Sequence, residues 1–188
     1  MDGQSTPSQT VGPFFAVMLR DGGVGAHVVE PGSPGAIRVE GTVLDGAGEP
    51  VPDALLEVWQ ANVHGRYAHP SDTRDDLDLV PGFTGFARCA TDDEGRFAFV
   101  VIKPGRVPFD DSRMQAPHID VSVFARGLLK RCVTRIYFPD EPDANAADPV
   151  LSSLPPSARE TLVARPDGRL LRFDVRLQGP GQTAFFAL

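Results

Sequence analysis

The density of glycine and proline limits, more than any other feature, what this chain can fold into. The 188 residues include 19 glycines and 18 prolines, about a fifth of the chain. Proline removes a backbone donor from a helix, and glycine brings backbone entropy that a helix must overcome. Helices of ordinary length cannot run through such a sequence. We therefore expect short strands separated by turns, with few and short helices.

Between the glycines and prolines, apolar side chains recur at every second position. The alternation covers residues 37–43, 97–101, 119–125 and 171–177. Such short alternating segments, bounded by turn residues, are typical of antiparallel strands that bury one face. We predict an all-β fold, an antiparallel β-sandwich with one or two short helices. One helix is predicted to begin at Ser157, after two prolines, with Ser157 and Glu160 as a capping-box pair.

Charge and hydropathy exclude several classes of protein. The 18 basic and 25 acidic residues give a formal net charge of −7. A protein that binds a phosphate backbone needs clustered basic charge, so we expect no nucleic-acid partner. The longest apolar run, residues 97–102, is far too short for a membrane span, and the first residues do not resemble a secretory signal. Two cysteines, Cys89 and Cys132, are too few for a disulfide framework. We predict a cytoplasmic protein with reduced, buried thiols and no membrane partner.

The first 35 residues differ in composition from the rest. An apolar cluster, VGPFF at 11–15, is followed by glycine-rich stretches at 21–25 and 31–35. Such a cluster either lies as an arm on a partner subunit or covers an open edge of its own sheet, and both alternatives stay open. We predict two parts, an N-terminal arm with loops at 1–35, packing on a partner subunit, and a β-sandwich domain at 36–188.

Few side chains form a pattern that suggests chemistry. His118 and Asp120 are two apart in a predicted strand, so they lie on one face and suit a metal ion. The spacing alone favours a surface histidine beside an aspartate. Tyr67, one of two tyrosines, stands between His64 and His69 in a predicted loop. No nucleophile elbow, phosphate loop or dinucleotide fingerprint is present. The residues alone indicate a β-sandwich with a candidate polar site.

Six short segments, in order along the chain, carry a resemblance to a known family. They are TPSQTVGPF at 6–14, LEVWQA at 56–61, TDDEG at 91–95, IKPG at 102–105, APHI at 116–119 and TRIYF at 134–138. With these segments the chain resembles the intradiol ring-cleavage dioxygenases. The segments RFDVRLQG at 172–179 and TAFF at 183–186 extend the resemblance to almost the whole chain. The family implies a prealbumin-like β-sandwich, in agreement with the strand pattern.

The resemblance also implies a metal site that this chain has lost. In the family a ferric ion is held by two tyrosines and two histidines, and the matching positions here are Tyr67, Val107, His118 and Asp120. Valine cannot ligate a metal, and Asp120 does not supply the missing second phenol. The resemblance thus implies a vestigial site without metal and no catalytic residue in this chain. Catalytic Fe(3+) is expected in a homologous, iron-binding β subunit of an (αβ)n assembly.

A role beside the substrate is implied as well. The resemblance places Thr10, Gly12 and Pro13 of the N-terminal segment, together with Arg135, at the pocket between the two subunits. The expected substrates are protocatechuate and O2. Arg135 would offer a planar pair of donors to the substrate carboxylate, or would form an interface salt bridge that never touches substrate. Both alternatives stay open.

Two rival interpretations remain at this point. One is a self-sufficient intradiol dioxygenase that uses a divergent site of Tyr67, His118 and Asp120, against which Val107 argues. The other is a non-catalytic β-sandwich binding module, against which the ordered segments argue. The metal content of the chain alone and in a complex would separate these interpretations.

Overall fold

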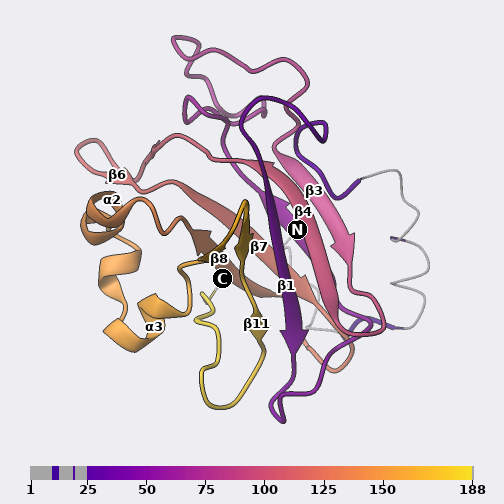
Figure 1. Cartoon of the computed structure of the whole chain (residues 1–188). Helices are drawn as coiled ribbons and strands as arrows, with labels where there is room; N and C mark the ends of the chain where they lie inside the picture. The colour runs from indigo at the N-terminus through magenta and orange to yellow at the C-terminus, as the bar shows by residue number, and fades with distance from the viewer. Residues whose placement is uncertain (1–9, 13–18, 20–24, 188) are drawn as a thin grey trace, which may run out of the picture.

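Two β-sheets make up the body of the molecule in the computed structural model, which describes residues 10–12, 19 and 25–187 (Figure 1). The first sheet contains β1 (Ala36–Leu44), β4 (Arg96–Ile102), β9 (Arg165–Asp167), β10 (Leu170–Arg172) and β11 (Val175–Arg176). The second sheet contains β3 (Phe86–Ala90), β2 (Leu55–Trp59), β7 (His118–Phe124) and β8 (Cys132–Tyr137), in that spatial order. A small ribbon joins β5 (Val107–Pro108) to β6 (Met114–Gln115).

The core lies between the facing surfaces of the two sheets. The buried side chains are those of the alternating apolar positions, among them Val39, Val43, Phe97, Phe99, Val101, Ile119, Val121 and Val123. Burial of each large apolar side chain stabilises the fold by roughly 1.5–3 kcal/mol, so the alternation decides which face turns inward. The predicted all-β sandwich is confirmed. Cys89 and Cys132 are free but only half-buried at the margin of the core, so the prediction of buried thiols holds in part.

The C-terminal segment departs from the antiparallel pattern. Residues 171–177, predicted as one strand, are divided between β10 and β11, and both pair in parallel with β1. The division falls opposite Gly41, where a Cβ atom would overlap the carbonyl oxygen of Phe173. Glycine therefore lets the two backbones approach closely at this point. The Phe173 amide donates to the Glu40 carbonyl oxygen at 2.8 Å, which keeps the segment on β1 across the break.

Two short helices and a 3₁₀ turn follow β8 in the described part of the chain. They are α2 (Pro142–Ala147), η1 (Leu151–Ser153) and α3 (Pro156–Glu160). The residue at the N-cap of α3 is Pro155, and no side chain caps the helix. The predicted capping box of Ser157 and Glu160 is therefore wrong, because the helix has already begun at Pro156, a residue that favours the first helical position. None of the described helices is long and apolar enough to cross a membrane.

Residues 25–30, which we assigned to the N-terminal arm, pack on the sandwich of their own chain. Val28 and Val29 are buried in the core. The Val28 amide donates to the Val100 carbonyl oxygen at 2.9 Å, and the Val28 carbonyl oxygen accepts from the Thr84 amide at 3.0 Å. The sandwich thus extends to these residues. Most of the remaining arm lies outside the described residues, and its packing on a partner stays a prediction.

Candidate functional site

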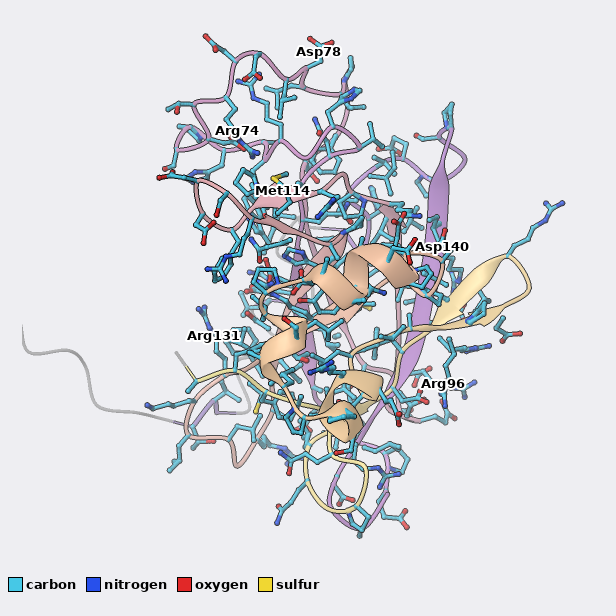
Figure 2. The ribbon with its side chains drawn as sticks, turned by 90° about the vertical axis from the view of Figure 1, so that its left-hand side faces the viewer. Arg74, Asp78, Arg96, Met114, Arg131 and Asp140 are labelled. Atoms are coloured by element: carbon cyan, nitrogen blue, oxygen red, sulfur yellow. The ribbon has the colours of Figure 1, made fainter. Side chains whose placement is uncertain are left out.

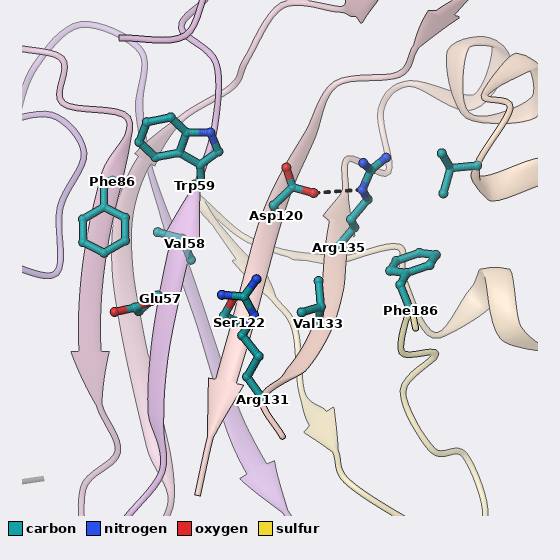
Figure 3. Close-up of a pocket in the computed structure, with 11 residues that line it drawn as sticks. Glu57, Val58, Trp59, Phe86, Asp120, Ser122, Arg131, Val133, Arg135 and Phe186 are labelled. Atoms are coloured by element: carbon teal, nitrogen blue, oxygen red, sulfur yellow. Dashed lines mark hydrogen bonds and ion pairs between the residues drawn. The ribbon is translucent and has the colours of Figure 1, made fainter. Parts of the chain in front are cut away.

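The outer face of the second sheet, turned away from the core, carries a charged pair. Asp120 of β7 lies directly opposite Arg135 of β8. Arg135 Nε donates to Asp120 Oδ1 at 2.9 Å (Figure 3). Their neighbours Ile119 and Ile136 are buried in the core, which places both charged side chains on the outer face. The side chain of Arg135 is only 18% exposed and that of Asp120 is 31% exposed, so the pair is partly shielded from water.

His118 is almost fully buried at the start of β7, and so it is not the surface histidine that spacing alone favoured. Its Nδ1 lies 2.7 Å from the Ala116 carbonyl oxygen. Nδ1 therefore carries the proton, and Nε2 keeps a free lone pair. Nε2 is 3.8 Å from Asp120 Oδ2, too far for a hydrogen bond. Burial lowers the pKa of His118, and the charge of Arg135 lowers it further against the opposing effect of Asp120. His118 is accordingly neutral.

A buried carboxylate fixes the segment that precedes His118. Asp148 Oδ2 accepts from the Ala116 amide at 2.7 Å. Asp148 Oδ1 accepts from the Tyr137 hydroxyl at 3.2 Å and from the Leu151 amide, in the following turn, at 2.7 Å. Because the carbonyl group of Ala116 accepts from His118, this carboxylate positions the imidazole through one intervening residue.

Tyr67 lies in the long loop between β2 and β3 and approaches the same face. Its ring stacks on Trp59, with 5.8 Å between the ring centroids and an angle of 4° between the planes. Burial raises the pKa of Tyr67 to about 12, the charge of Asp120 raises it too, and the charge of Arg135 opposes them. The phenol is therefore protonated and within electrostatic reach of the Asp120–Arg135 pair.

Val107 connects to the same pair through the small ribbon. It is buried and pairs with Gln115 across β5 and β6. Arg135 Nη1 donates to Gln115 Oε1 at 2.7 Å. A hollow of about 390 Å³ separates this ribbon from the Tyr67 loop and is lined by Tyr67, Arg74, Val107 and Gln115. Figure 2 shows Arg74 of the loop and Met114 of β6 at the same end of the molecule.

A groove of about 470 Å³ runs along the outer face, and the Asp120–Arg135 pair is part of its lining. Trp59, Phe86 and Phe186 form aromatic walls, and Arg131 extends into the groove (Figure 3). The C-terminal segment closes one side of it, since the Phe186 amide donates to the Val133 carbonyl oxygen at 2.8 Å. The groove thus offers apolar surface together with charges of both signs, since Glu57 and Asp120 line it as well.

Thr10 and Gly12 lie near the far end of the β7–β8 hairpin. Thr10 Oγ1 accepts from the amide of Gly127, in the hairpin loop, at 3.1 Å. Thr10 and Gly12 are both exposed, and a Cβ atom at Gly12 would meet nothing within 4 Å. Pro13 lies outside the described residues. Within one chain, the structure does not bring Thr10 and Gly12 to the Asp120–Arg135 pair, which lies toward the opposite end of the hairpin.

A β-sandwich in which a loop with Tyr67 faces the start of the strand that carries His118 and Asp120 is the arrangement that the resemblance to intradiol dioxygenases implied. A family model described as "Dioxygenase" matches residues 24–179, and the chain belongs to the intradiol dioxygenase family. It is 44% identical to the protocatechuate 3,4-dioxygenase alpha chain of Burkholderia cepacia over 97% of each chain. It is 40% identical to the beta chain from the same organism, over 84% of this chain and 71% of that one.

A solved structure agrees with this assignment. The dioxygenase domain of a dioxygenase–carbohydrate-binding fusion protein from Streptomyces sp. SirexAA-E is 28% identical, with a TM-score of 0.58. The match covers 94% of this chain and 100% of that chain. The predicted family is confirmed, and with it the assignment to an enzyme family rather than to an unrelated binding module.

The donor atoms present do not fit the ferric ion that the family implies. Val107 has no donor atom, and the carboxylate of Asp120 is engaged by a guanidinium group. In the described part of the chain, no three side chains of histidine, cysteine, aspartate or glutamate converge as a metal site. The phenol of Tyr67 and Nε2 of His118 remain, and two donors do not hold a ferric ion in place. We therefore derive no chemical step through iron in this chain.

Sequence reasoning missed three residues that shape the site: Gln115, Tyr137 and Asp148. Asp148 carried a usable signal, because an aspartate directly before a short turn is a typical acceptor for the free amides of that turn. Tyr137 lies in the segment 134–138 that carried the resemblance, but its contact with Asp148, like that of Gln115 with Arg135, depends on how β8 and the β5–β6 ribbon are placed in space.

Proposed function

We propose that this chain is the α chain of a protocatechuate 3,4-dioxygenase and acts together with a homologous β chain that holds the iron. The reaction cleaves the protocatechuate ring between its two hydroxyl-bearing carbons and adds both atoms of O2, which gives 3-carboxy-cis,cis-muconate. The iron of the partner would activate the bound catecholate as a Lewis acid. This chain would supply walls of the pocket and the interface, in the cytoplasm.

Identity values alone do not choose between an α and a β chain, since they are 44% and 40%. The residues at the implied iron-ligand positions distinguish the two and favour an α chain. Val107 and the ion-paired Asp120 stand at two of the four positions where the family implies iron ligands, and this observation carries the proposal. The match in length supports it, because the chain covers 97% of the alpha chain and only 71% of the beta chain.

The test of the assembly is metal content, measured on the chain alone and on a complex purified with its partner. We expect the complex to contain ferric iron and the visible absorption of tyrosinate bound to iron, and the chain alone to contain neither. A coloured preparation of the chain alone with stoichiometric ferric iron would refute the proposal. It would favour the self-sufficient dioxygenase instead.

We further propose that Thr10, Gly12 and Pro13 reach the substrate pocket of the partner. The exposure of Thr10 and Gly12 and the open space around Gly12 support this role. Gly12→Val should lower the turnover of protocatechuate and of catechol alike, because the added side chain takes up volume and removes no charge. Unchanged turnover in an intact complex would contradict it.

The contact of Arg135 with the substrate carboxylate stays a proposal beside its internal ion pair. Arg135 Nη2 donates to no acceptor among the described residues, which leaves it available. Removal of a charge-assisted hydrogen bond costs about 1.5–3 kcal/mol, so Arg135→Ala should raise KM for protocatechuate roughly ten- to a hundredfold. Catechol, which lacks the carboxylate, should be affected far less. Equal losses on the two substrates would contradict the contact. Arg131→Ala, in the groove that Arg135 also lines, is the control for lost positive charge on this face.

A further inference from the structure

The guanidinium group of Arg135 is linked to two of the four positions where the family implies iron ligands, directly to Asp120 and through Gln115 to Val107. It donates to Asp120 from Nε at 2.9 Å. It donates to Gln115 from Nη1 at 2.7 Å, and Gln115 is the cross-strand partner of Val107. A planar guanidinium can serve two acceptors in different directions, which a lysine ammonium group does with less geometric order.

The other two positions, His118 and Tyr67, lie on the side of Asp120. His118 keeps the lone pair of Nε2 on the side of Asp120, 3.8 Å from Asp120 Oδ2. The Tyr67 ring stacks on Trp59, and Trp59 is the cross-strand partner of Asp120 on β2. The four positions are thus connected to Asp120 and Gln115, two of the side chains to which Arg135 donates. Figure 3 shows Asp120 between Trp59 and Arg135 on the outer face of the sheet.

We propose that Arg135 is a built-in cation that takes the place of the metal ion in this chain, holding the site together and closing it to metal. The proposal rests on the proposed function for the identity of the four positions. It explains two substitutions together. Asp120, where a neutral histidine is expected, gives the cation a counter-charge, and Val107 removes a phenol that would otherwise need a metal or another partner.

Electrostatics makes the same side chain a barrier to iron. A metal ion bound through residue 120 would sit beside the guanidinium group that donates to Asp120 at 2.9 Å, on a side chain that is only 18% exposed. A unit charge at about 4 Å in a partly buried site changes the affinity for another unit charge by roughly a thousandfold. Restoring the missing donors without removing Arg135 should therefore not restore the site.

The experiment uses the full chain with the donors rebuilt by Val107→Tyr and Asp120→His. Three forms are expressed in iron-supplemented medium: this double variant, the same variant with Arg135→Gln, and the same variant with Arg131→Gln. Arg131 is exposed and lines the same groove as Asp120 and Arg135, so its replacement removes one nearby positive charge and keeps the hydrogen bonds of Arg135. Metal content and the visible tyrosinate–iron absorption are measured. We expect iron and colour only in the form that carries Arg135→Gln.

Equal iron uptake with and without Arg135 would overturn the proposal, and so would the absence of iron from the Arg135→Gln form. Iron in the unchanged chain would instead refute the proposed function, which keeps the two failures apart.

A double-mutant cycle in the unchanged background covers the case in which the rebuilt variants do not fold. It consists of Asp120→Asn, Arg135→Gln and the combination, each measured by equilibrium unfolding. If Arg135 is the cation of the site and Asp120 its counter-charge, Asp120→Asn should destabilise the fold more in the chain that keeps Arg135 than in the chain with Arg135→Gln. We expect the two effects on the folding equilibrium constant to differ by about tenfold. Additive effects of the two substitutions would overturn the proposal.

Discussion

Replacement of Asp148 tests whether one buried carboxylate positions the start of β7. The side chain is fully buried and accepts hydrogen bonds from four donors: the amides of Ala116, Val150 and Leu151 and the hydroxyl of Tyr137. In Asp148→Ala these donors lose their acceptor. Ala116 and Leu151 are themselves buried, so their amides cannot turn to bulk water.

The size of the effect follows from these contacts. A buried donor left without an acceptor costs about 1–3 kcal/mol, so two such amides predict a loss of about 2–6 kcal/mol in the free energy of unfolding for Asp148→Ala. Asp148→Asn keeps one acceptor oxygen but places an amide group against one of the backbone donors. We expect it to cost about 1–3 kcal/mol, because one buried donor is then unsatisfied.

Equilibrium unfolding in urea measures both variants, with the fluorescence of Trp59, the only tryptophan, as the signal. Asp143→Asn is the control, since Asp143 is exposed in the first turn of α2, and it should change stability by less than about 0.5 kcal/mol. An Asp148→Ala variant as stable as this control would refute the reasoning. So would an Asp148→Asn variant that loses more stability than Asp148→Ala.

Three further outcomes are expected. Gly41→Ala should destabilise the fold by about 1–3 kcal/mol or more, because the new Cβ atom meets a backbone carbonyl group. Gly46→Ala is the control in the same unfolding assay and should cost little, because its Cβ atom meets only the Gln178 side chain, at 3.3 Å. Burial raises the pKa of Tyr67 to about 12 and that of Tyr137 further still, so ultraviolet titration should find little tyrosinate at pH about 10.5, where an ordinary tyrosine is roughly three quarters ionised. The lowered pKa of buried His118 means that the unfolded chain binds more protons, so stability should fall as the pH drops below about 6.5, and His118→Gln should weaken this dependence.

The strands of the sandwich could be predicted because burial of one face leaves a direct pattern in the sequence. The alternation at 37–43 and 119–125 matches β1 and β7 and names the side chains that turn inward. The same alternation at 171–177 did not reveal the break at Phe173 or the parallel pairing with β1. Pairing direction depends on where a distant segment returns, and the close backbone approach at Gly41 appears only when both segments are in place.

The candidate site was predictable to a smaller extent. That His118 and Asp120 share a face follows from strand geometry, but the burial of His118 does not, because it depends on the segments that cover the start of β7. The contact of Asp120 with Arg135 depends on the register between β7 and β8. A shift of one residue would turn Arg135 toward the core and leave Asp120 without its partner. Only the resemblance, and not the spacing, brought Tyr67 and Val107 into the same site.

A continuous chain of contacts replaces the order that a bound ion would give to this region. Arg135 Nη1 approaches the Tyr137 hydroxyl at 3.4 Å, and the hydroxyl donates to Asp148. Asp148 also accepts from the Ala116 amide, and the Ala116 carbonyl oxygen accepts from His118. In a low-dielectric environment such a network stabilises the fold when every polar group is satisfied and destabilises it when one is left unpaired. The contributions of these residues to stability should therefore depend on one another, so that replacing Arg135 at one end changes the effect of replacing His118 at the other. This dependence gives a physical reason why a chain with Val107 and Asp120 at two of the positions where the family implies iron ligands keeps the strand geometry of the site, as its proposed place beside an iron-bearing partner would require.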